Sequence, residues 1–326
     1  MFIDEIDSFP RRGYGSHNAA YFASLNNALL TEIGGSRGVV VIAACNDPSV
    51  LDPALIRSGR LDQLIEVPLP APSALPQIFR YHLGAATSQI RELERLSLLC
   101  IGSSGADIAK MVRAAKRIAR ADRADLHDRH LEEAIKAQLV SLPPARRRVI
   151  AVHEAGHAAV LYRSRPSADI VVSLASAVTM SAGDGDITFC SREEIEELLV
   201  EYLAGRAAEE ILLGKISGGS GGSEQSDLGR ASALALEAIA KRGLSARGQL
   251  AWYGREAGSG LSPSRCSDEA EAWLNAAYTK ARERISQNEL FVAMIAHALL
   301  ERGALASSDL ASIDRIIDAP MPPARR

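Results

Sequence analysis

The sequence predicts an α/β fold in the amino-terminal part of the chain and a mainly α-helical fold in the rest. Residues 2–3 form the end of an apolar strand, residues 39–44 form a continuous apolar run, and a helical pattern lies between them at residues 21–32. Aromatic residues make up only 5% of the chain and alanine is abundant, which favours helical packing elsewhere. We therefore expect part of a parallel sheet with its crossover helix, followed by helical domains.

Length and charge limit the number of domains and the kinds of partner. A chain of 326 residues is long enough for two or three domains, which we place at residues 1–70, 71–140 and 141–326. The net charge of −3 and the pI of about 6.2 give no case for nucleic acid or anionic lipid as a partner. The basic residues 146–148 are expected to form an exposed helix start rather than a nucleic-acid site.

Cysteine usage and hydropathy predict the compartment. No apolar run approaches the ~20 residues of a transmembrane helix, and no signal peptide is visible. We expect this chain to be soluble and cytoplasmic, with any membrane location supplied by an upstream segment. Four scattered cysteines lack metal or redox spacing and fit a reducing cytoplasm: Cys45, Cys100, Cys190 and Cys266.

Polar residues end both apolar runs of the α/β part. Asp4 and Glu5 follow the first run as in a Walker B site, where one carboxylate holds Mg²⁺ through water and the next orients the attacking water. A solvated acidic turn is the alternative interpretation of these two residues. Asn46 ends the second run, at the sheet edge where doubly wound folds bind ligands. Together, the polar residues at the ends of the two apolar runs favour an ATP and Mg²⁺ site.

A phosphate-binding loop is missing from the sequence. No Gly-x-x-x-x-Gly-Lys-Ser/Thr motif occurs, so we expect no ATP hydrolysis by this chain alone. Met1 falls inside the first apolar run, so the strands that should flank residues 2–6 and 39–44 are lacking. We expect uncovered apolar faces there and interpret the chain as truncated at its amino-terminal end.

Residues 72–140 predict a small helical bundle. Within it, Ser104 precedes Gly105 and Ala106 as the N-cap of a helix, with an acidic residue, Asp107, three positions after the cap.

The most specific chemical signal is the run from His153 to His157. Its two imidazoles stand four residues apart, so both can point from one helix face at one metal. Catalytic zinc commonly takes three protein ligands and leaves one position for water, and Glu154 would then be the general base. The flanking residues 149–152 and 158–161 are apolar, so unpaired histidines would be costly there. An ordinary helix with two partly exposed histidines is the alternative.

Two histidines need a third protein ligand, and the candidates are acidic residues downstream. Asp227 lies where a glycine- and serine-rich loop gives way to an alanine-rich helix. It could cap that helix, coordinate zinc, or support a ligating histidine. Glu209 or Glu210 is the next candidate, and spacing alone does not separate them from Asp227.

A short β-hairpin is expected over residues 170–189, with its turn at residues 183–186. Asp184 and Asp186 lie in that turn, and two acids in a glycine turn favour a plain turn over a calcium site.

Several of these runs resemble the FtsH-type AAA+ zinc metalloproteases. The resemblance implies zinc as cofactor, Asp227 as the third ligand and Glu154 as the catalytic base. It also implies an edge strand that pairs with extended substrate, for which residues 187–189 are the nearest match. The matching runs cover nearly all of the chain after about residue 145: residues 153–157, 203–210, 226–228, 242–245, 281–283 and 297–301.

The resemblance extends to the first part of the chain through residues 51–62 and 102–108. It implies ATP and Mg²⁺ in a complete ring, either a homo-hexamer or a ring with partner AAA+ subunits. It implies unfolded or misassembled proteins as substrates, and a membrane anchor that would place the enzyme at the cytoplasmic face of the inner membrane. The implied nucleotide-site residues are Asn46 as sensor 1, Arg57 and Arg60 as arginine fingers toward a neighbouring subunit, and Gly105 and Ala106 beside adenine.

Two other functions stay open on the sequence alone. The chain could be a non-catalytic assembly or regulatory subunit that supplies Arg57 and Arg60 to a partner AAA+ ring. It could also be an ATP-independent zinc peptidase, which the missing phosphate-binding loop favours. The intact set of His153, Glu154, His157 and Asp227 argues against a wholly inactive protein.

Overall fold

The structure, a computed structural model of the chain, describes residues 1–8, 24, 27–33, 38–138, 142–174, 178–181, 187–245 and 263–318. The chain divides into two compact units, Met1–Pro68 and Leu69–Arg326. Among the described residues, no helix combines the length and the hydropathy that a membrane span requires.

The first unit contains a minimal parallel sheet. Strand β1 (Phe2–Ile3) pairs in parallel with β2 (Ile42–Ala43), as the sequence predicted. Residues 27–33 are helical and overlap the predicted helix at residues 21–32, ending one residue later. A small core of Leu30, Ile33 and Leu55 stabilises the described part of this unit. Short 3-10 turns follow the strands at Ile6–Ser8 (η1) and Pro48–Val50 (η2).

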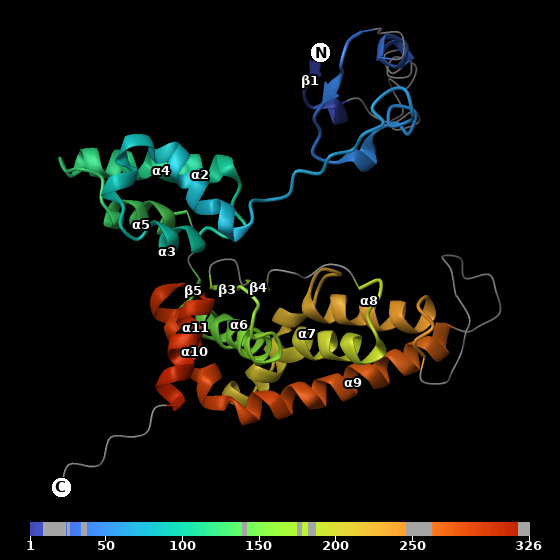
Figure 1. Ribbon diagram of the computed structural model, residues 1–326, viewed down its shortest axis with the longest axis vertical. Coiled ribbons are helices and arrows are strands. Elements are labelled where there is room, and N and C mark those ends of the chain that lie inside the picture. Colours follow the sequence, from blue (N-terminus) through green and yellow to red (C-terminus); the bar gives the residue numbers. More distant parts are fainter. Residues whose placement is uncertain are drawn as a thin grey trace. The chain divides into compact units, whose positions relative to one another are not determined.

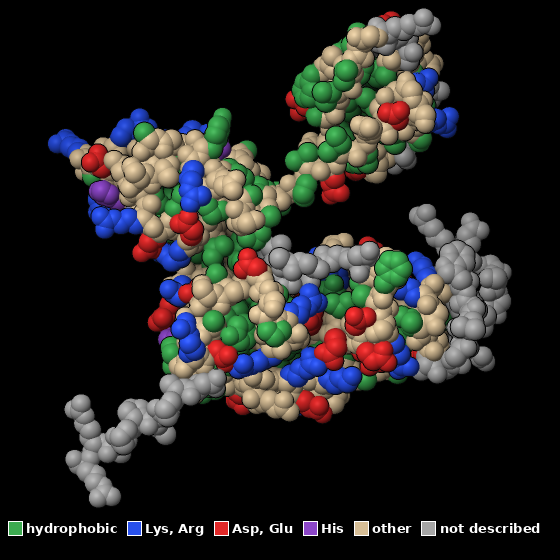
Figure 2. Space-filling model, viewed as in Figure 1, with side chains coloured by type: hydrophobic (Ala, Val, Ile, Leu, Met, Phe, Trp, Pro, Cys, Tyr) green, Lys and Arg blue, Asp and Glu red, His purple; other side chains and the backbone are tan. Residues whose placement is uncertain are grey.

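The prediction of a long, fully buried second strand is wrong. Strand β2 has two residues, and Val40 and Ile42 are 76% and 59% exposed. Hydrophobic side chains accordingly lie on the surface of this unit (Figure 2). Parallel strands become buried when neighbouring strands and helices cover them, and in the described part of this unit β1 and β2 pair only with each other. The uncovered apolar faces that the sequence predicted are confirmed.

A helical bundle begins the second unit. Its helices bury one apolar face each around Leu75, Phe79 and Leu131. The side chain of Ser104 accepts a hydrogen bond from the Asp107 N–H, and the Asp107 carboxylate accepts one from Ser104 N–H at 3.0 Å. The predicted N-cap is therefore confirmed. The elements are η3 (Pro72–Ala74), α2 (Leu75–Leu83), η4 (Gly84–Gln89), α3 (Leu93–Leu98), α4 (Gly105–Ala121) and α5 (Asp128–Lys136).

The rest of the second unit is mainly helical, as expected (Figure 1). Helix α7 packs against α6, α8 and α9, and α6 also packs against α10. Small residues let α6 and α7 approach closely, because a Cβ on Gly156 would lie 2.6 Å from the Ala208 Cβ. The elements are α6 (Pro144–Ser164), α7 (Arg192–Leu213), η5 (Gly218–Ser220), α8 (Asp227–Ala240), α9 (Pro263–Gln287), α10 (Glu289–Arg302) and α11 (Ser307–Asp318).

A three-stranded antiparallel sheet accompanies these helices. Strands β3 (Ile170–Ser173), β4 (Val178–Ser181) and β5 (Ala304–Ala306) take the order β4-β3-β5. The predicted hairpin is confirmed, with Ile170 paired to Ser181 and Ser173 paired to Val178. The predicted turn at residues 183–186, with Asp184 and Asp186, lies outside the described residues.

The predicted edge strand at residues 187–189 is wrong. These residues form a turn, in which Cys190 N–H donates to the Ile187 carbonyl. Arg242 donates to the same carbonyl at 3.0 Å, so the segment leads into the start of α7 instead of extending the sheet. The edge strand on this side of the sheet is β4.

Ion pairs link the exposed faces of α7 and α9. Arg284 lies 2.6 Å from Glu197, and Lys280 lies 3.4 Å from Glu196. Acidic and basic side chains are accordingly mixed on this surface (Figure 2). Residues 146–148 at the start of α6 are exposed, as predicted.

Candidate metal centre

Helix α6 carries the two histidines in its buried part. Pro144 opens the helix, where its missing N–H removes no helical hydrogen bond. His153, Glu154 and His157 are only 8%, 4% and 9% exposed. The alternative of an ordinary helix with partly exposed histidines is therefore wrong, and these polar groups require partners inside the protein.

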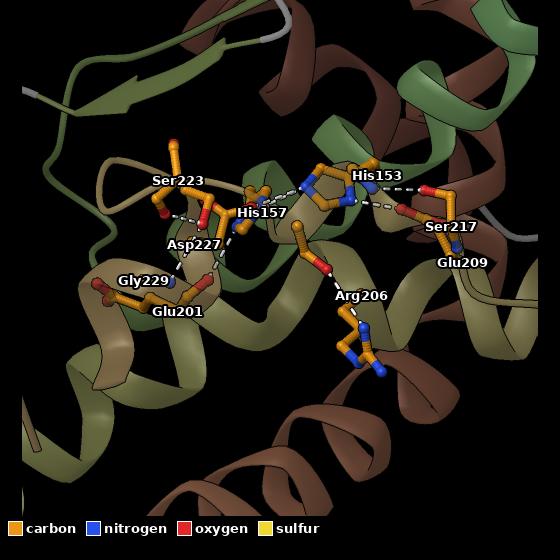
Figure 3. Close-up of polar contacts among 12 residues, drawn as sticks. His153, His157, Glu201, Arg206, Glu209, Ser217, Ser223, Asp227 and Gly229 are labelled. Carbon is orange, nitrogen blue, oxygen red and sulfur yellow. Dashed lines mark hydrogen bonds and ion pairs between the residues drawn. The ribbon is translucent and has the colours of Figure 1, made fainter. Parts of the chain in front are cut away.

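Asp227 brings a carboxylate to both imidazoles (Figure 3). Its Oδ2 lies 3.0 Å from His153 Nε2 and 3.4 Å from His157 Nε2. The two Nε2 atoms lie 3.2 Å apart. Two nitrogens and one oxygen thus converge on one point, with all three candidate ligand atoms within 4.8 Å of one another.

Asp227 does not cap helix α8, contrary to one of the sequence interpretations. The cap is Ser226, whose Oγ accepts a hydrogen bond from Gly229 N–H at 3.2 Å. A Cβ on Gly229 would lie 2.4 Å from the Ser223 carbonyl oxygen, so glycine lets the preceding loop fold against the helix start. Because Ser226 satisfies the helix end, the Asp227 side chain can turn toward the histidines.

The second nitrogen of each imidazole has its own partner. His153 Nδ1 lies 2.7 Å from Glu209 Oε1, and Glu209 Oε2 accepts a hydrogen bond from Ser217 N–H at 2.6 Å. His157 Nδ1 donates to the main-chain carbonyl of Glu201 at 2.8 Å. These bonds fix the ring orientations and direct both Nε2 atoms to the same side, the arrangement that metal-binding histidines require.

The other candidate ligands lie elsewhere. Glu209 contacts His153 from the side opposite Asp227, so it supports a histidine. Glu210 pairs with Tyr278 and Arg282. Of the three acidic candidates, Asp227 is the one beside both Nε2 atoms.

Glycine at position 205 allows α7 to pass directly beside the histidines. A Cβ at that position would lie 2.5 Å from His157 Nε2 and 2.6 Å from His153 Nε2. Sequence reasoning did not assign this residue a role in the site. A glycine inside a helix interior costs helix stability and so signals a close approach, which Gly205 provides.

Charge at the site matches a cation. Burial disfavours the charged form of His153, but hydrogen bonds to Asp227 and Glu209 outweigh it and raise the His153 pKa to about 10. Burial also works against ionised Asp227, yet its hydrogen bonds to His153 and His157 hold the Asp227 pKa well below the ordinary value. Without metal, a proton therefore takes the place of the positive charge. The donor set fits zinc, which binds imidazole nitrogen and carboxylate oxygen.

A cavity of about 370 Å³ opens at the site. Its wall includes Glu154 beside the candidate ligands, and Arg230 one turn after Asp227. Apolar side chains complete it, among them Leu198 and Tyr202 of α7. The cavity gives a second molecule access to the atoms around the histidines.

The predicted nucleotide-site residues are spread over both compact units. Asn46 N–H donates to Asp7 Oδ2 at 3.0 Å, which ties the ends of β1 and β2 together. Asp7 was not among the predicted residues, although it follows the same acidic run. Asp4 Oδ1 accepts a hydrogen bond from Glu5 N–H at 3.0 Å, and Glu5 adopts a positive φ of 50°.

The remaining predicted residues of that site occupy a turn and a helix start. Arg60 donates to the Ala54 carbonyl at 2.8 Å, and its N–H donates to the Arg57 carbonyl at 3.1 Å. Gly105 and Ala106 open helix α4 in the second unit.

A buried His-Glu-x-x-His helix with a third donor from another helix defines the class of zinc metallopeptidases. Comparison with protein families agrees with this class. The pattern of peptidase family M41 matches residues 140–313, and that of the ATPase family associated with various cellular activities (AAA) matches residues 1–69. The chain belongs to peptidase family M41.

Similar proteins carry both regions. The chain is 33% identical to "ATP-dependent zinc metalloprotease FTSH 3, mitochondrial" of Oryza sativa subsp. japonica, over 96% of this chain and 42% of the relative. It is 33% identical to "ATP-dependent zinc metalloprotease FtsH 2" of Symbiobacterium thermophilum, over 96% of this chain and 57% of the relative. The chain spans about half the length of the curated relatives it matches. The predicted resemblance to FtsH-type zinc metalloproteases is confirmed.

Proposed function

We propose that this chain supplies the proteolytic centre of an ATP-dependent zinc metalloprotease that degrades unfolded or misassembled proteins. The observation that carries the proposal is the convergence of His153 Nε2, His157 Nε2 and Asp227 Oδ2, with the opposite nitrogen of each imidazole already bonded. These three residues would hold zinc. A fourth position toward the cavity would take water or substrate.

Bound zinc would polarise the peptide carbonyl and lower the pKa of a water molecule. Glu154 is adjacent to His153 and lines the cavity, so it is placed to act as general base. Its carboxylate would accept the proton of the attacking water and pass it to the leaving amine nitrogen. Glu209 would keep the His153 ring in place during this transfer.

Substrate would bind as an extended chain. The order β4-β3-β5 leaves β4 with a free edge among the described strands, and an extended peptide can add to such an edge through main-chain hydrogen bonds. This mode reads the main chain more than the side chains, which suits a protease for unfolded polypeptides. It replaces residues 187–189 by Val178–Ser181 as the substrate-binding strand.

The ATP-dependent part of the function involves the first 140 residues. Asp4 and Glu5 would act on Mg²⁺ and water, and Asn46 would sense the γ-phosphate. Arg57 and Arg60 would reach the nucleotide of a neighbouring subunit in a hexamer, where an arginine stabilises charge on the transferred phosphoryl group.

The three-domain organisation is part of the same proposal. Residues 1–70 would form part of an ATPase core, residues 71–140 its helical lid, with Gly105 and Ala106 beside adenine, and residues 141–326 the peptidase domain. The cytoplasmic location and the upstream membrane anchor stay predictions.

The test is cleavage of an unfolded protein by the purified chain loaded with zinc, with and without ATP. Glu154→Gln keeps the zinc ligands and removes the base, so it should bind stoichiometric zinc and lose at least about 100-fold in cleavage rate. A chelator should abolish cleavage by the wild type. Failure of the wild type to bind zinc, or undiminished cleavage by Glu154→Gln, would overturn the proposal.

A further inference from the structure

We propose that Arg165 and Glu201 form a clasp that positions the zinc ligand His157, an inference that rests on the proposed zinc site. The clasp joins the carboxyl-terminal end of α6 to the middle of α7. Both are positioning residues, because they act on zinc through His157 alone.

Glu201 has two separate connections. Its main-chain carbonyl accepts the Nδ1–H of His157 at 2.8 Å. Its side chain accepts hydrogen bonds from Ser164 Oγ at 2.9 Å and from Arg165 Nε at 3.0 Å. Arg165 Nη2 donates to the second carboxylate oxygen, so the guanidinium is bidentate. Glu201 therefore orients His157 through its main chain, while residues at the end of α6 hold its side chain (Figure 3 shows Glu201 beside His157).

The clasp is too buried to be an ordinary surface ion pair. Glu201 is 9% exposed, and the Arg165 side chain is 27% exposed. A bidentate arginine pair has a defined geometry, unlike the interchangeable contacts of exposed lysines. Removal of this partner would leave an uncompensated buried charge on Glu201, which is strongly destabilising, and relief of that charge by exposure to water would displace α7.

The two imidazoles are supported in different ways. Glu209 holds His153 with a side chain, whose χ angles can adjust when the helices shift. His157 is held by a main-chain oxygen, which has no such freedom. The position of that oxygen follows the register of α7 against α6. A contact that fixes this register near His157 therefore controls the place of its Nε2 atom.

A second ion pair on the same helix allows a controlled test. Arg284 of α9 pairs with Glu197, one turn before Glu201 on α7, at 2.6 Å. The Arg284 side chain is 34% exposed, comparable to Arg165. Among the described residues, the Glu197 ion pair joins α7 to α9 and involves no candidate metal ligand. Arg284→Ala thus removes a more exposed ion pair from the same helix, since the Glu197 side chain is 43% exposed and the Glu201 side chain 11%, without touching the support of His157.

The experiment measures zinc affinity of the full chain by competition with a chromophoric chelator. Arg165→Ala and Glu201→Gln should each weaken zinc binding by about 10- to 100-fold, the range for groups that orient ligands. Arg165→Lys should recover part of the loss, and Arg284→Ala should stay within about twofold of wild type. The cobalt(II) form should show an altered visible spectrum in Arg165→Ala, because the ligand geometry changes.

The outcomes separate this inference from the proposed function. Wild-type zinc affinity in both Arg165→Ala and Glu201→Gln, or an equal loss in Arg284→Ala, would refute the clasp while leaving the zinc site intact. A wild-type chain that binds no zinc would refute the proposed function itself. Thermal unfolding of the metal-free variants gives the stability control, and Glu201→Gln serves if Arg165→Ala does not fold.

Discussion

Replacing Gly205 by alanine should abolish tight zinc binding with little effect on the fold. The added Cβ would lie 2.5 Å from His157 Nε2 and 2.6 Å from His153 Nε2. Ordinary contacts between such atoms are about 3.5 Å, so the imidazoles or the helix must move by about 1 Å. In a sound zinc site the metal–ligand distances lie within about 0.2 Å of their standard values, so a shift of this size cannot be absorbed without loss of coordination geometry. The methyl group therefore displaces both histidines from productive positions.

The size of the effect follows from these distances. Changes that disturb ligand orientation alone cost about 10- to 100-fold in metal affinity, and here both nitrogens are displaced. We expect a loss of at least about 100-fold, or about 3 kcal/mol. Overpacking should cost the metal-free protein about 1–3 kcal/mol, partly offset by about 1 kcal/mol from the better helix propensity of alanine.

The assay is zinc stoichiometry and affinity, with thermal unfolding of the metal-free chain beside it. Gly105→Ala is the control, because a Cβ at this helical glycine meets no atom within 4 Å. It should bind zinc as the wild type does. Wild-type zinc affinity in Gly205→Ala would show that α7 does not constrain the histidines, and the reasoning would be wrong.

Four further predictions concern protonation and the support of the ligands. Because the pKa of His153 is raised to about 10, this imidazole is protonated at pH 7 and zinc must displace the proton. Zinc binding at pH 7 should therefore release about one proton, and zinc affinity should increase as pH rises toward 10. Calorimetry in buffers of different ionisation enthalpy measures the released proton. In the metal-free protein, the raised pKa of His153 adds folding stability that is fully present below the unfolded pKa of about 6.5 and is lost as pH rises through 10. An unfolding temperature that does not change with pH across this window would contradict the prediction. Glu209→Gln should weaken zinc binding by about 10-fold or more, since a neutral amide supports His153 less than a carboxylate does, and titration against a chelator measures this. Burial raises the pKa of the Cys100 thiol to about 12, so this cysteine should resist alkylation at pH 8 in the folded chain while denatured protein reacts, with mass spectrometry locating the label.

The sequence was informative about the metal centre because its signals are local. A four-residue spacing on a helix places His153 and His157 on one face whatever surrounds them. The third ligand was harder, because residues 153 and 227 meet only through the packing of α6, α7 and α8. Spacing left Asp227, Glu209 and Glu210 open, and the resemblance to FtsH-type proteases favoured the one that the structure places beside both rings.

The sequence did not reveal the roles of main-chain groups, and it gave little indication of a position where a side chain must be absent. The carbonyl of Glu201 orients His157, and every residue has a carbonyl, so no residue type marks it. Gly205 left a weak signal as a glycine inside a helix. The strand errors have a different cause. Alternation predicts that a hairpin exists, but its register depends on cross-strand pairing. The edge strand was predicted at residues 187–189, and the structure has it at Val178–Ser181.

All groups that build the metal centre lie in one compact unit. The three candidate ligands, their supporting partners and the cavity fall within residues 149–230, inside Leu69–Arg326. Their positions depend on contacts among α6, α7 and α8. Zinc affinity should therefore depend on how closely these three helices pack.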